Sequence, residues 1–309
     1  MTILLQASRH TAFVISRTRI RIPVAPGVGS AASLRIAIPI VSPPAFTVPR
    51  APEIRYEAGN YRLRLACTSE DQEAACRLRF KVFNIELGEG LESSYETGMD
   101  TDRFDSVCDH LLVEDKLRRR VVGTYRMQSG TTAARSRGYY SEQEFNLAPY
   151  EPLRPGILEL GRAAIDREHR TPEVLTLLWR GIAQYAHDRG LRYLLGCSSL
   201  NSCDPAEGWQ MYRVLEPYRV SPEFETVPTA AFACPQDQPT AQPLEIPEGP
   251  APAPARIPKL LKTYLAIGAR IAAAPAWDRE FRTIDFLTLL DLHLLSPSAR
   301  NRFLAPLTQ

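Results

Sequence analysis

The fold of this 309-residue chain is decided by one stretch, Gly156-Ile157-Leu158-Glu159-Leu160-Gly161-Arg162-Ala163-Ala164-Ile165-Asp166. Its run of apolar residues predicts a buried strand. A helix is expected next, because Thr171 is a good N-cap, Pro172 suits the first helical position and Gly190 suits the end. Residues 191–197 predict another strand. Strand, helix and strand together indicate a parallel crossover unit and therefore an α/β fold.

Two ionisable side chains lie within the first of these strands. In a regular strand Glu159 and Arg162 point to opposite faces, because side chains alternate with a period of two. A bulge near Gly161 would turn both toward one cleft and would free backbone N–H groups to stabilise an oxyanion. The alternative is an ion pair between Glu159 and Arg162 that locks the sheet. Both residues are therefore candidate catalytic residues.

The turn between this strand and the helix is basic. Arg167 and Arg170 precede the helix N-terminus that Thr171 caps, and free N–H groups beside guanidinium groups suit a phosphate. The alternative is a set of solvated charges. The sequence contains no glycine-rich loop, G-x-G-x-x-G pattern or Walker pattern, so no nucleotide cofactor is expected.

The remaining elements complete one domain over residues 56–309. Residues 61–66 alternate polar and apolar, as a half-buried strand does. A capping box at 69–72 opens a helix. The apolar face expected for this helix consists of Ala75, Leu78, Val82 and Ile85. Residues 110–114 and 121–127 predict an antiparallel hairpin.

The last third of the chain begins with a proline-rich stretch. Residues 235–258 predict a weakly folded excursion within the domain. An amphipathic helix is expected at 259–271. A final apolar segment, 284–295, is expected to complete the sheet.

The first 50 residues differ in charge from the rest of the chain. They contain six Arg, no Lys and no acid, a net charge of +6, which leaves −4 for residues 51–309 because the whole chain carries +2. A mildly acidic body argues against a nucleic-acid binder. We interpret residues 1–55 as a disordered or mis-started extension. A targeting peptide and an added strand or membrane-surface arm are the alternatives.

Cysteine and histidine give little sign of a metal or redox site. The six Cys form no C-x-x-C pair, which predicts buried free thiols, with Cys197 as a nucleophile the alternative. His110, at the start of a predicted strand, is a candidate acid/base or a histidine satisfied by a neighbouring carboxylate. The five His show no H-x-x-x-H or H-E-x-x-H spacing, so no metal site is predicted.

Seven short pieces of the chain together resemble a known family. In order they are Arg79-Phe80-Lys81-Val82-Phe83, Asp102-Arg103-Phe104-Asp105, Cys108-Asp109-His110-Leu111-Leu112-Val113, Val122-Gly123-Thr124-Tyr125-Arg126, Tyr140-Ser141-Glu142-Gln143-Glu144-Phe145, Leu158-Glu159-Leu160-Gly161-Arg162 and Leu178-Trp179-Arg180-Gly181-Ile182. The set resembles the ornithine N-acyltransferases that make lyso-ornithine lipid, a family often labelled hemolysin-like within the GNAT acyltransferase superfamily. It is also similar to the autoinducer synthases that build acyl-homoserine lactones. The resemblance extends over roughly residues 61–300, including the Thr283-Ile284-Asp285 segment.

The resemblance implies a fold and a reaction. The fold would be the GNAT mixed central sheet with flanking helices, splayed between its fourth and fifth strands, here 156–166 and 191–199. The reaction would move a 3-hydroxy fatty acyl group, or a similar one, from acyl carrier protein to the α-amine of L-ornithine, the first step of ornithine lipid biosynthesis. No cofactor is implied beyond the carrier-protein thioester.

The resemblance also implies roles for individual residues. Glu159 would be the base that takes a proton from the attacking amine. By analogy with the autoinducer synthases, the acyl and amino-acid pockets would be shaped by Arg79, Phe83, Asp102, Asp105 and Arg126. An acid pair such as Asp102 and Asp105 would suit the cationic side chain of ornithine.

The donor is indicated by a departure from the superfamily pattern. Acetyl-CoA users carry R/Q-x-x-G-x-G/A before the helix, and this chain lacks those glycines at 167–172. The departure favours the single phosphodiester of a carrier protein's pantetheine arm, held by Arg167, Arg170 and Thr171. The carrier is acidic in such systems, so the candidate docking charges are Arg118, Arg119, Arg120, Arg135 and Arg137.

Three alternative functions belong to other classes. A sister enzyme would acylate another amine, such as glutamine, glycine or a homoserine precursor. A membrane-lytic, hemolysin-like protein would need long amphipathic or apolar segments, and only 259–271 qualifies. A catalytically dead acyl-carrier sensor would bind the carrier without turnover. We expect a cytoplasmic protein, with 259–271 packed on the sheet or in peripheral contact with the inner face of the membrane.

Overall fold

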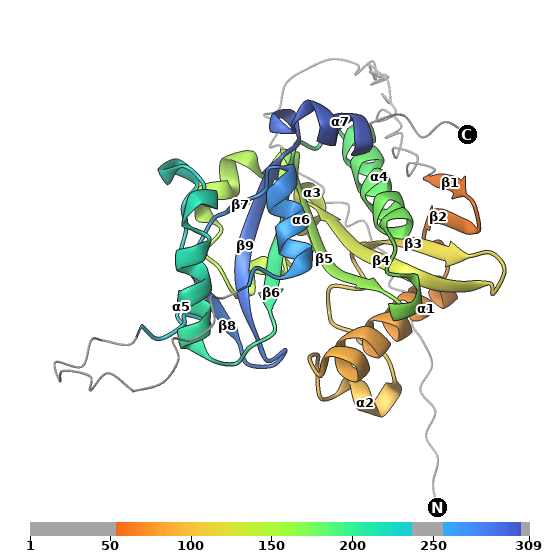
Figure 1. Ribbon diagram of the computed structural model, residues 1–309, viewed down its shortest axis with the longest axis horizontal. Coiled ribbons are helices and arrows are strands. Elements are labelled where there is room, and N and C mark those ends of the chain that lie inside the picture. The colour runs from red at the N-terminus through yellow and green to blue at the C-terminus, as the bar shows by residue number, and fades with distance from the viewer. Residues whose placement is uncertain (1–53, 237–255, 304–309) are drawn as a thin grey trace, which may run out of the picture. The chain divides into compact units, whose positions relative to one another are not determined.

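A nine-stranded mixed sheet runs through the protein (Figure 1). The structure, a computed structural model, describes residues 54–236 and 256–303. Nearly all of the predicted extension 1–55 and most of the proline-rich stretch 235–258 lie outside the described residues. In the part that is described, no helix has both the length and the apolar character needed to cross a bilayer.

The strands follow the spatial order β1-β2-β3-β4-β5-β6-β9-β7, and β8 pairs with β9 beside this path. Their bounds are Arg55–Ala58 (β1), Tyr61–Leu65 (β2), Asp109–Asp115 (β3), Arg120–Ser129 (β4), Ile157–Ile165 (β5), Tyr193–Leu200 (β6), Arg270–Ile271 (β7), Ala276–Asp278 (β8) and Thr283–Asp291 (β9). All neighbours are antiparallel except β5 and β6, which are parallel. The predicted crossover unit is therefore confirmed.

Helices cover both faces of this sheet (Figure 1). One face carries α4 (Pro172–Asp188), α5 (Pro205–Val214), α6 (Lys259–Ile267) and α7 (Pro297–Phe303). The other face carries α1 (Ser69–Phe80) and α3 (Gly130–Arg135), and the short α2 (Ser94–Thr97) follows α1 in the chain. Hydrophobic side chains fill both interfaces, so the sheet is the middle of three layers.

The sequence of α4 explains its position. Thr171 accepts a hydrogen bond from the Val174 N–H, and Pro172 is the first helical residue, as predicted. Gly181 faces the sheet, where an added Cβ would lie 2.8 Å from a Leu111 methyl group and 2.9 Å from one of Leu63. The helix can therefore approach β2 and β3 closely only because position 181 has no side chain.

Two helices end differently from their predicted bounds. After α1, the chain widens into a π-helical turn over Lys81–Leu87, which rotates Ile85 out of the apolar face and leaves it 61% exposed. The prediction of Ile85 as a core residue was therefore wrong. Helix α6 stops at Gly268, whose φ of +112° breaks the helix, and Arg270–Ile271 joins the sheet as β7. Leu261 and Leu265 of α6 are buried against the rest of the protein.

Strand β5 carries the predicted bulge. Gly161 lies opposite Arg126, but Ala164 lies opposite Thr124, so β5 has one residue more than β4 over this interval. Within the bulge, Arg162 adopts a left-handed backbone conformation with φ of +51°. Leu160 before the bulge and Ala163 after it pack in the same cluster beneath α4. The bulge thus changes which residues of β5 face α4.

Strands β5 and β6 separate soon after they meet. They pair only from Ile157–Glu159 on β5 to Tyr193–Leu195 on β6, although both strands continue well beyond. At Gly196 an added Cβ would lie 2.2 Å from the Leu160 carbonyl oxygen, so only glycine allows the last close approach. The splay predicted between these two strands is confirmed.

Candidate active site

A cavity of about 610 Å³ opens where β5 and β6 separate. Side chains that alternate to opposite faces of the sheet line it together, including Tyr125 with Arg126 and Leu194 with Leu195. The cavity therefore passes through the sheet, from the α4 face to the α1 face. Its size is that of a small-molecule site.

The wall on the α4 face is apolar and aromatic. It includes Trp179 of α4 and Tyr264 of α6, whose rings meet edge to face at 5.5 Å, and Leu290 of β9. The Tyr264 and Tyr125 hydroxyl groups hydrogen-bond to each other, and burial raises the pKa of Tyr125 to about 12. These aromatic and aliphatic side chains are uncharged at neutral pH and suit an alkyl chain.

The wall on the opposite face contains Glu159. Its side chain is buried, and it accepts hydrogen bonds from the Tyr140 N–H at 2.9 Å and from the N–H and hydroxyl of Ser141 at 2.8 Å each. Burial raises the pKa of Glu159, and these three hydrogen bonds oppose that rise without cancelling it. Among the ion pairs of the described residues there is none between Glu159 and Arg162, so the sheet-locking alternative is not what the structure shows.

Three arginines and three aspartates form a buried cluster next to this wall, which we call the Arg–Asp cluster: Arg79, Arg126, Arg162, Asp100, Asp102 and Asp105. Arg79 donates two hydrogen bonds of 2.8 Å to Asp105. Arg126 and Arg162 contact the two oxygens of Asp102 at 2.7 Å and 3.0 Å. The bidentate and shared contacts fix the 100–105 loop against α1, β4 and β5.

The cluster is electrically balanced. Burial raises the pKa of Asp102, but the charges of Arg126 and Arg162 outweigh it and hold that pKa below the usual range. Asp105 is held low in the same way, chiefly by Arg79. Three carboxylates therefore face three guanidinium groups, and no net charge remains to attract a ligand.

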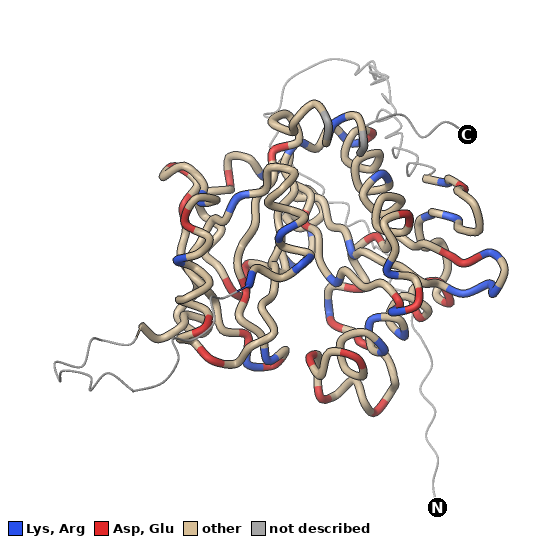
Figure 2. The backbone as a smooth tube through the Cα atoms, in the orientation of Figure 1, with Lys and Arg blue, Asp and Glu red and all other residues tan. Residues whose placement is uncertain are grey.

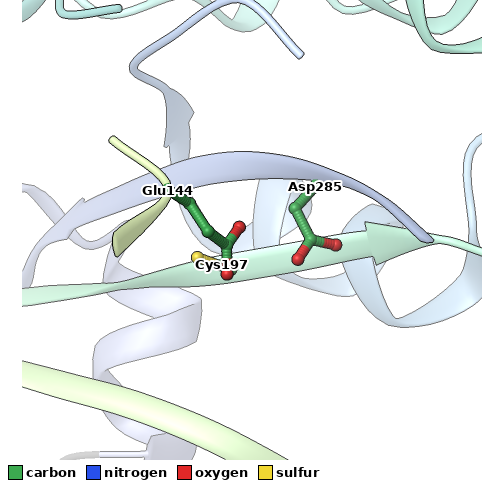
Figure 3. A group of neighbouring side chains, drawn as sticks. All are labelled: Glu144, Cys197 and Asp285. Atoms are coloured by element: carbon green, nitrogen blue, oxygen red, sulfur yellow. The ribbon is translucent and has the colours of Figure 1, made fainter. Parts of the chain in front are cut away.

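A second acidic group lies across the cavity, and we call it the acid pocket: Glu144, Cys197 and Asp285 (Figure 3). One carboxylate oxygen of each acid and the Cys197 sulfur lie within 4.8 Å of one another. Asp285 and Cys197 line the cavity, whereas Glu144 is 1% exposed and is not part of the lining. Burial raises the pKa of Glu144, and the charges of Asp285 and Asp278 raise it further.

Cys197 is a protonated thiol in these surroundings. Burial and the neighbouring Glu144 raise its pKa well above the usual value. Its sulfur donates to the Ser141 hydroxyl at 3.5 Å. A thiolate nucleophile would need the opposite environment, so the Cys197 alternative finds no support. All six cysteines are free thiols, as predicted, although Cys67 and Cys203 are exposed.

Comparison with known proteins places the sequence among acyltransferases. Residues 78–180 match the acetyltransferase (GNAT) domain family. The chain is 32% identical over 263 residues to the L-ornithine N(alpha)-acyltransferase of Rhizobium meliloti (strain 1021), covering 80% of this chain and 85% of that protein. The protein of the same name from Brucella abortus (strain 2308) is 30% identical over 262 residues, covering 77% and 86%.

The chain belongs to the L-ornithine N(alpha)-acyltransferase family. It is an acyltransferase with the GNAT fold, and the resemblance predicted from the sequence is confirmed. Among solved structures, FeeM, an N-acyl amino acid synthase from uncultured soil microbes, is 12% identical with a TM-score of 0.46, covering 77% of this chain and 95% of that one.

The cavity of the acyltransferase includes five of the predicted site residues: Phe83, Arg126, Glu159, Arg162 and Arg170. The bulge brings Glu159 and Arg162 to the same cavity, as the sequence predicted. Arg79, Asp102 and Asp105 are absent from its lining and belong to the Arg–Asp cluster instead. Because arginines already neutralise the two aspartates, the predicted use of this pair for a cationic side chain does not fit the structure.

His110 lies outside the cavity lining of the acyltransferase. It is 3% exposed, and its Nε2 lies 3.3 Å from the Asp105 carbonyl oxygen. Burial and the charge of Arg79 lower its pKa. The histidine is therefore neutral and held by its neighbours, which corresponds to the second of the two sequence interpretations.

The three residues predicted to hold a phosphate differ in position. Arg170 lines the cavity, donates to the Ile165 carbonyl oxygen at 3.0 Å and pairs with Glu86. The Thr171 hydroxyl is occupied as the α4 cap. Arg167 is exposed and is not part of the lining. Of these three residues, Arg170 is the one that lines the cavity of the acyltransferase.

Three acidic residues of this site were given no role from the sequence: Glu89, Glu144 and Asp285. Glu89 lines the cavity, and burial, with the charge of Asp285, raises its pKa to about 7. Glu144 and Asp285 lie in pieces that carried the family resemblance, but no spacing rule links them. The nearest sequence signal to Glu89 is its place in a stretch rich in Gly, Ser and acidic residues after the first helix, residues 86–100.

Proposed function

We propose that this acyltransferase moves a 3-hydroxy fatty acyl group, or a similar one, from an acyl carrier protein thioester to the α-amine of L-ornithine, the first step of ornithine lipid biosynthesis. The main observation that supports this proposal is a cavity that passes through the sheet, with an apolar wall on the α4 face and acidic residues on the other. The name of the curated relatives supports ornithine as the acceptor.

The donor arm would enter between the separated strands. Beyond Glu159, no strand of the described residues pairs with β5 on its β6 side, so backbone N–H and C=O groups there would be available to the amides of pantetheine. Arg170 lies on the cavity wall at the start of α4 and would hold the single phosphodiester. The acyl chain would then occupy the apolar wall formed by Trp179, Tyr264 and Leu290.

The chemistry follows from where Glu159 lies. An α-amine with a pKa of about 8 is mostly protonated at neutral pH, so it must lose a proton before it attacks. Glu159, directly or through one water, takes that proton, and its buried carboxylate is a stronger base than an exposed one. The amine nitrogen then bonds to the thioester carbon.

The attack turns the thioester carbonyl oxygen into an oxyanion. Backbone N–H groups near the bulge at Arg162 would stabilise this charge. Collapse of the intermediate breaks the C–S bond and re-forms the carbonyl. The nitrogen loses its second proton, the pantetheine thiolate leaves and takes up one proton to become a thiol, and the product is an amide.

The carrier protein would dock on exposed arginines. The tip of the β3–β4 hairpin is basic, visible as blue segments in Figure 2, and includes Arg118 and Arg119. Arg135 and Arg137 are exposed near α3, while Arg120 pairs with Glu168 at 3.1 Å. Peripheral contact with a membrane stays a prediction.

The test is amide formation from purified components. Glu159→Gln should lower kcat by about 100- to 10,000-fold, the usual contribution of a general base. The matched control is Glu142→Gln, a neighbouring carboxylate that pairs with Arg154 at 3.0 Å and is absent from the cavity lining. Near-wild-type rates in a folded Glu159→Gln protein would remove the base assignment. Equal use of acyl-CoA and carrier-protein thioesters would contradict the donor assignment.

A further inference from the structure

The two acidic groups of the cavity differ in their partners. Every carboxylate of the Arg–Asp cluster contacts an arginine. By contrast, Glu89, Glu144, Asp278 and Asp285 form no ion pair with any lysine or arginine within residues 54–236 and 256–303. Asp278 instead accepts from the backbone N–H groups of residues 280 and 281. One side of the cavity therefore carries carboxyl groups that no arginine or lysine of the described residues neutralises.

The acid pocket also has unused hydrogen-bond acceptors. Both carboxylate oxygens of Glu144 and the Oδ1 of Asp285 are buried without a hydrogen-bond partner in the described part of the chain. The two carboxyl groups lie close together beside β6, with the Cys197 sulfur next to Glu144 (Figure 3). Buried carboxylates without a cation are costly, and burial raises the pKa of both Glu144 and Asp285, so the pair favours a bound proton. A positively charged donor can take the place of that proton.

The shape of the missing partner follows from these acceptors. An ammonium group has three N–H donors and one positive charge, which matches three unfilled oxygens and an unbalanced carboxylate pair. A guanidinium or a neutral amide would be larger or would leave the charge unpaired. The residues therefore suit a primary amine on a flexible chain.

The acid pocket lies within reach of the proposed reaction centre. The Ser141 hydroxyl donates to Glu159 at 2.8 Å and accepts from the Cys197 thiol at 3.5 Å. Ser141 thus connects the carboxylate that faces the α-amine to the pocket that contains Asp285. An amino acid with an ammonium at the end of a short methylene chain would contact both ends at once.

We propose that the acid pocket binds the side-chain ammonium of a diamino-acid acceptor, with Asp285 as the direct contact and Glu144 completing the coordination. The inference rests on the proposed function and deepens it, because it names the residues that would select ornithine over neutral amino acids. A neutral side chain would leave buried acceptors unpaired, the situation in which polar sites discriminate most strongly. Asp285 is then a specificity-determining residue rather than a catalytic one.

The first measurement uses the wild-type protein and two acceptors, ornithine and norvaline, which has the same chain without the terminal amine. We expect kcat/KM for ornithine to exceed that for norvaline by on the order of 100-fold or more. Asp285→Asn keeps the shape of the side chain and removes its charge. It should raise KM for ornithine about 30-fold and change kcat/KM for norvaline far less, so that the ratio collapses.

The matched control is Asp291→Asn, the same substitution on the same strand at a residue that pairs with Arg192 outside the cavity. It should leave the ornithine-to-norvaline ratio unchanged. If Asp285→Asn does not fold, Glu144→Gln should lower the ratio in the same direction. A wild-type ratio near one would overturn the proposal whatever the variants do.

The outcomes separate the two proposals. A wild-type protein that acylates no ornithine from any thioester would refute the proposed function. A wild-type protein that acylates ornithine, with an unchanged acceptor ratio in folded Asp285→Asn, would refute the acid pocket alone. A metal ion bound one per chain in the wild type and lost in Asp285→Asn would also overturn it, because the pocket would then hold a cation of another kind.

Discussion

Replacing Arg79 with methionine removes the central charge of the Arg–Asp cluster and keeps an unbranched apolar stem. Arg79 is 0% exposed, donates two hydrogen bonds of 2.8 Å to Asp105 and lies 2.8 Å from an Asp100 oxygen. After the substitution Asp105 keeps Arg126 at 3.1 Å, and Asp100 keeps Arg162 at 3.4 Å. Each aspartate therefore loses its nearer arginine and retains a more distant one.

The expected cost follows from this partial compensation. Removing one partner of a buried ion pair usually costs about 3–5 kcal/mol, because the other charge is left unpaired. We expect the lower end, about 3 kcal/mol, for Arg79→Met, since a second arginine remains near each aspartate. For a protein of this size, that loss lowers Tm by about 6–12 °C.

The assay is thermal and denaturant unfolding beside a control on the same helix. Arg77 has a side chain 58% exposed and contacts Glu73 at 3.5 Å, so Arg77→Met should change the free energy of unfolding by less than about 1 kcal/mol. Equal losses from the two variants would refute the assignment of Arg79 as a structural anchor.

The same variant makes a prediction about pH. Arginine holds the pKa of Asp105 below its usual range, so this residue stabilises the fold above its unfolded pKa and less as the pH falls. The stability gap between wild type and Arg79→Met should therefore narrow between about pH 4 and pH 2. A gap that stays constant over that interval would contradict the electrostatic explanation.

Two further predictions concern the cavity. Burial raises the pKa of Glu89 to about 7, so this residue gains its charge as the pH rises through neutrality. The KM for ornithine should therefore fall between about pH 6 and pH 8 in the wild type and change less in Glu89→Gln. Identical pH profiles of initial rates in the two proteins would refute this prediction. Gly196→Ala places a Cβ 2.2 Å from the Leu160 carbonyl oxygen and should lower the free energy of unfolding by about 1–3 kcal/mol. Gly161→Ala should change it little, because nothing lies within 4 Å of a Cβ at that position. Unfolding experiments in which both variants match the wild type would disprove the close-approach argument.

Local patterns were enough to predict the frame of the site. The cap at Thr171, the strand 156–166 and the bulge near Gly161 depend on neighbours in sequence, and all three appear in the structure. Ile85 was misplaced because the turn Lys81–Leu87 is π-helical, and a helical period of 3.6 does not anticipate that change.

The acid pocket could not be predicted in this way. Glu144 follows a short 3-10 turn that Glu159 anchors, whereas Asp285 lies on β9 opposite Ser199 of β6. Their proximity depends on the register of β6 against β9 and on where the 140–145 segment packs against the sheet. No rule of spacing connects two residues that meet only through tertiary packing.

The contrast between the two acidic groups explains why they serve different purposes. Arg162 adopts a left-handed conformation that costs about 1–2 kcal/mol, and its contacts with Asp100 and Asp102 offset that strain. The aspartates of the Arg–Asp cluster thus stabilise the bulge that opens the sheet, and arginines of the protein neutralise their charge. Asp285 lines the cavity, and it pairs with no arginine in the part of the chain that the structure describes. A cationic side chain would therefore be attracted to the side of the cavity that contains Asp285 and Glu89, and the α-amine would then be directed toward Glu159.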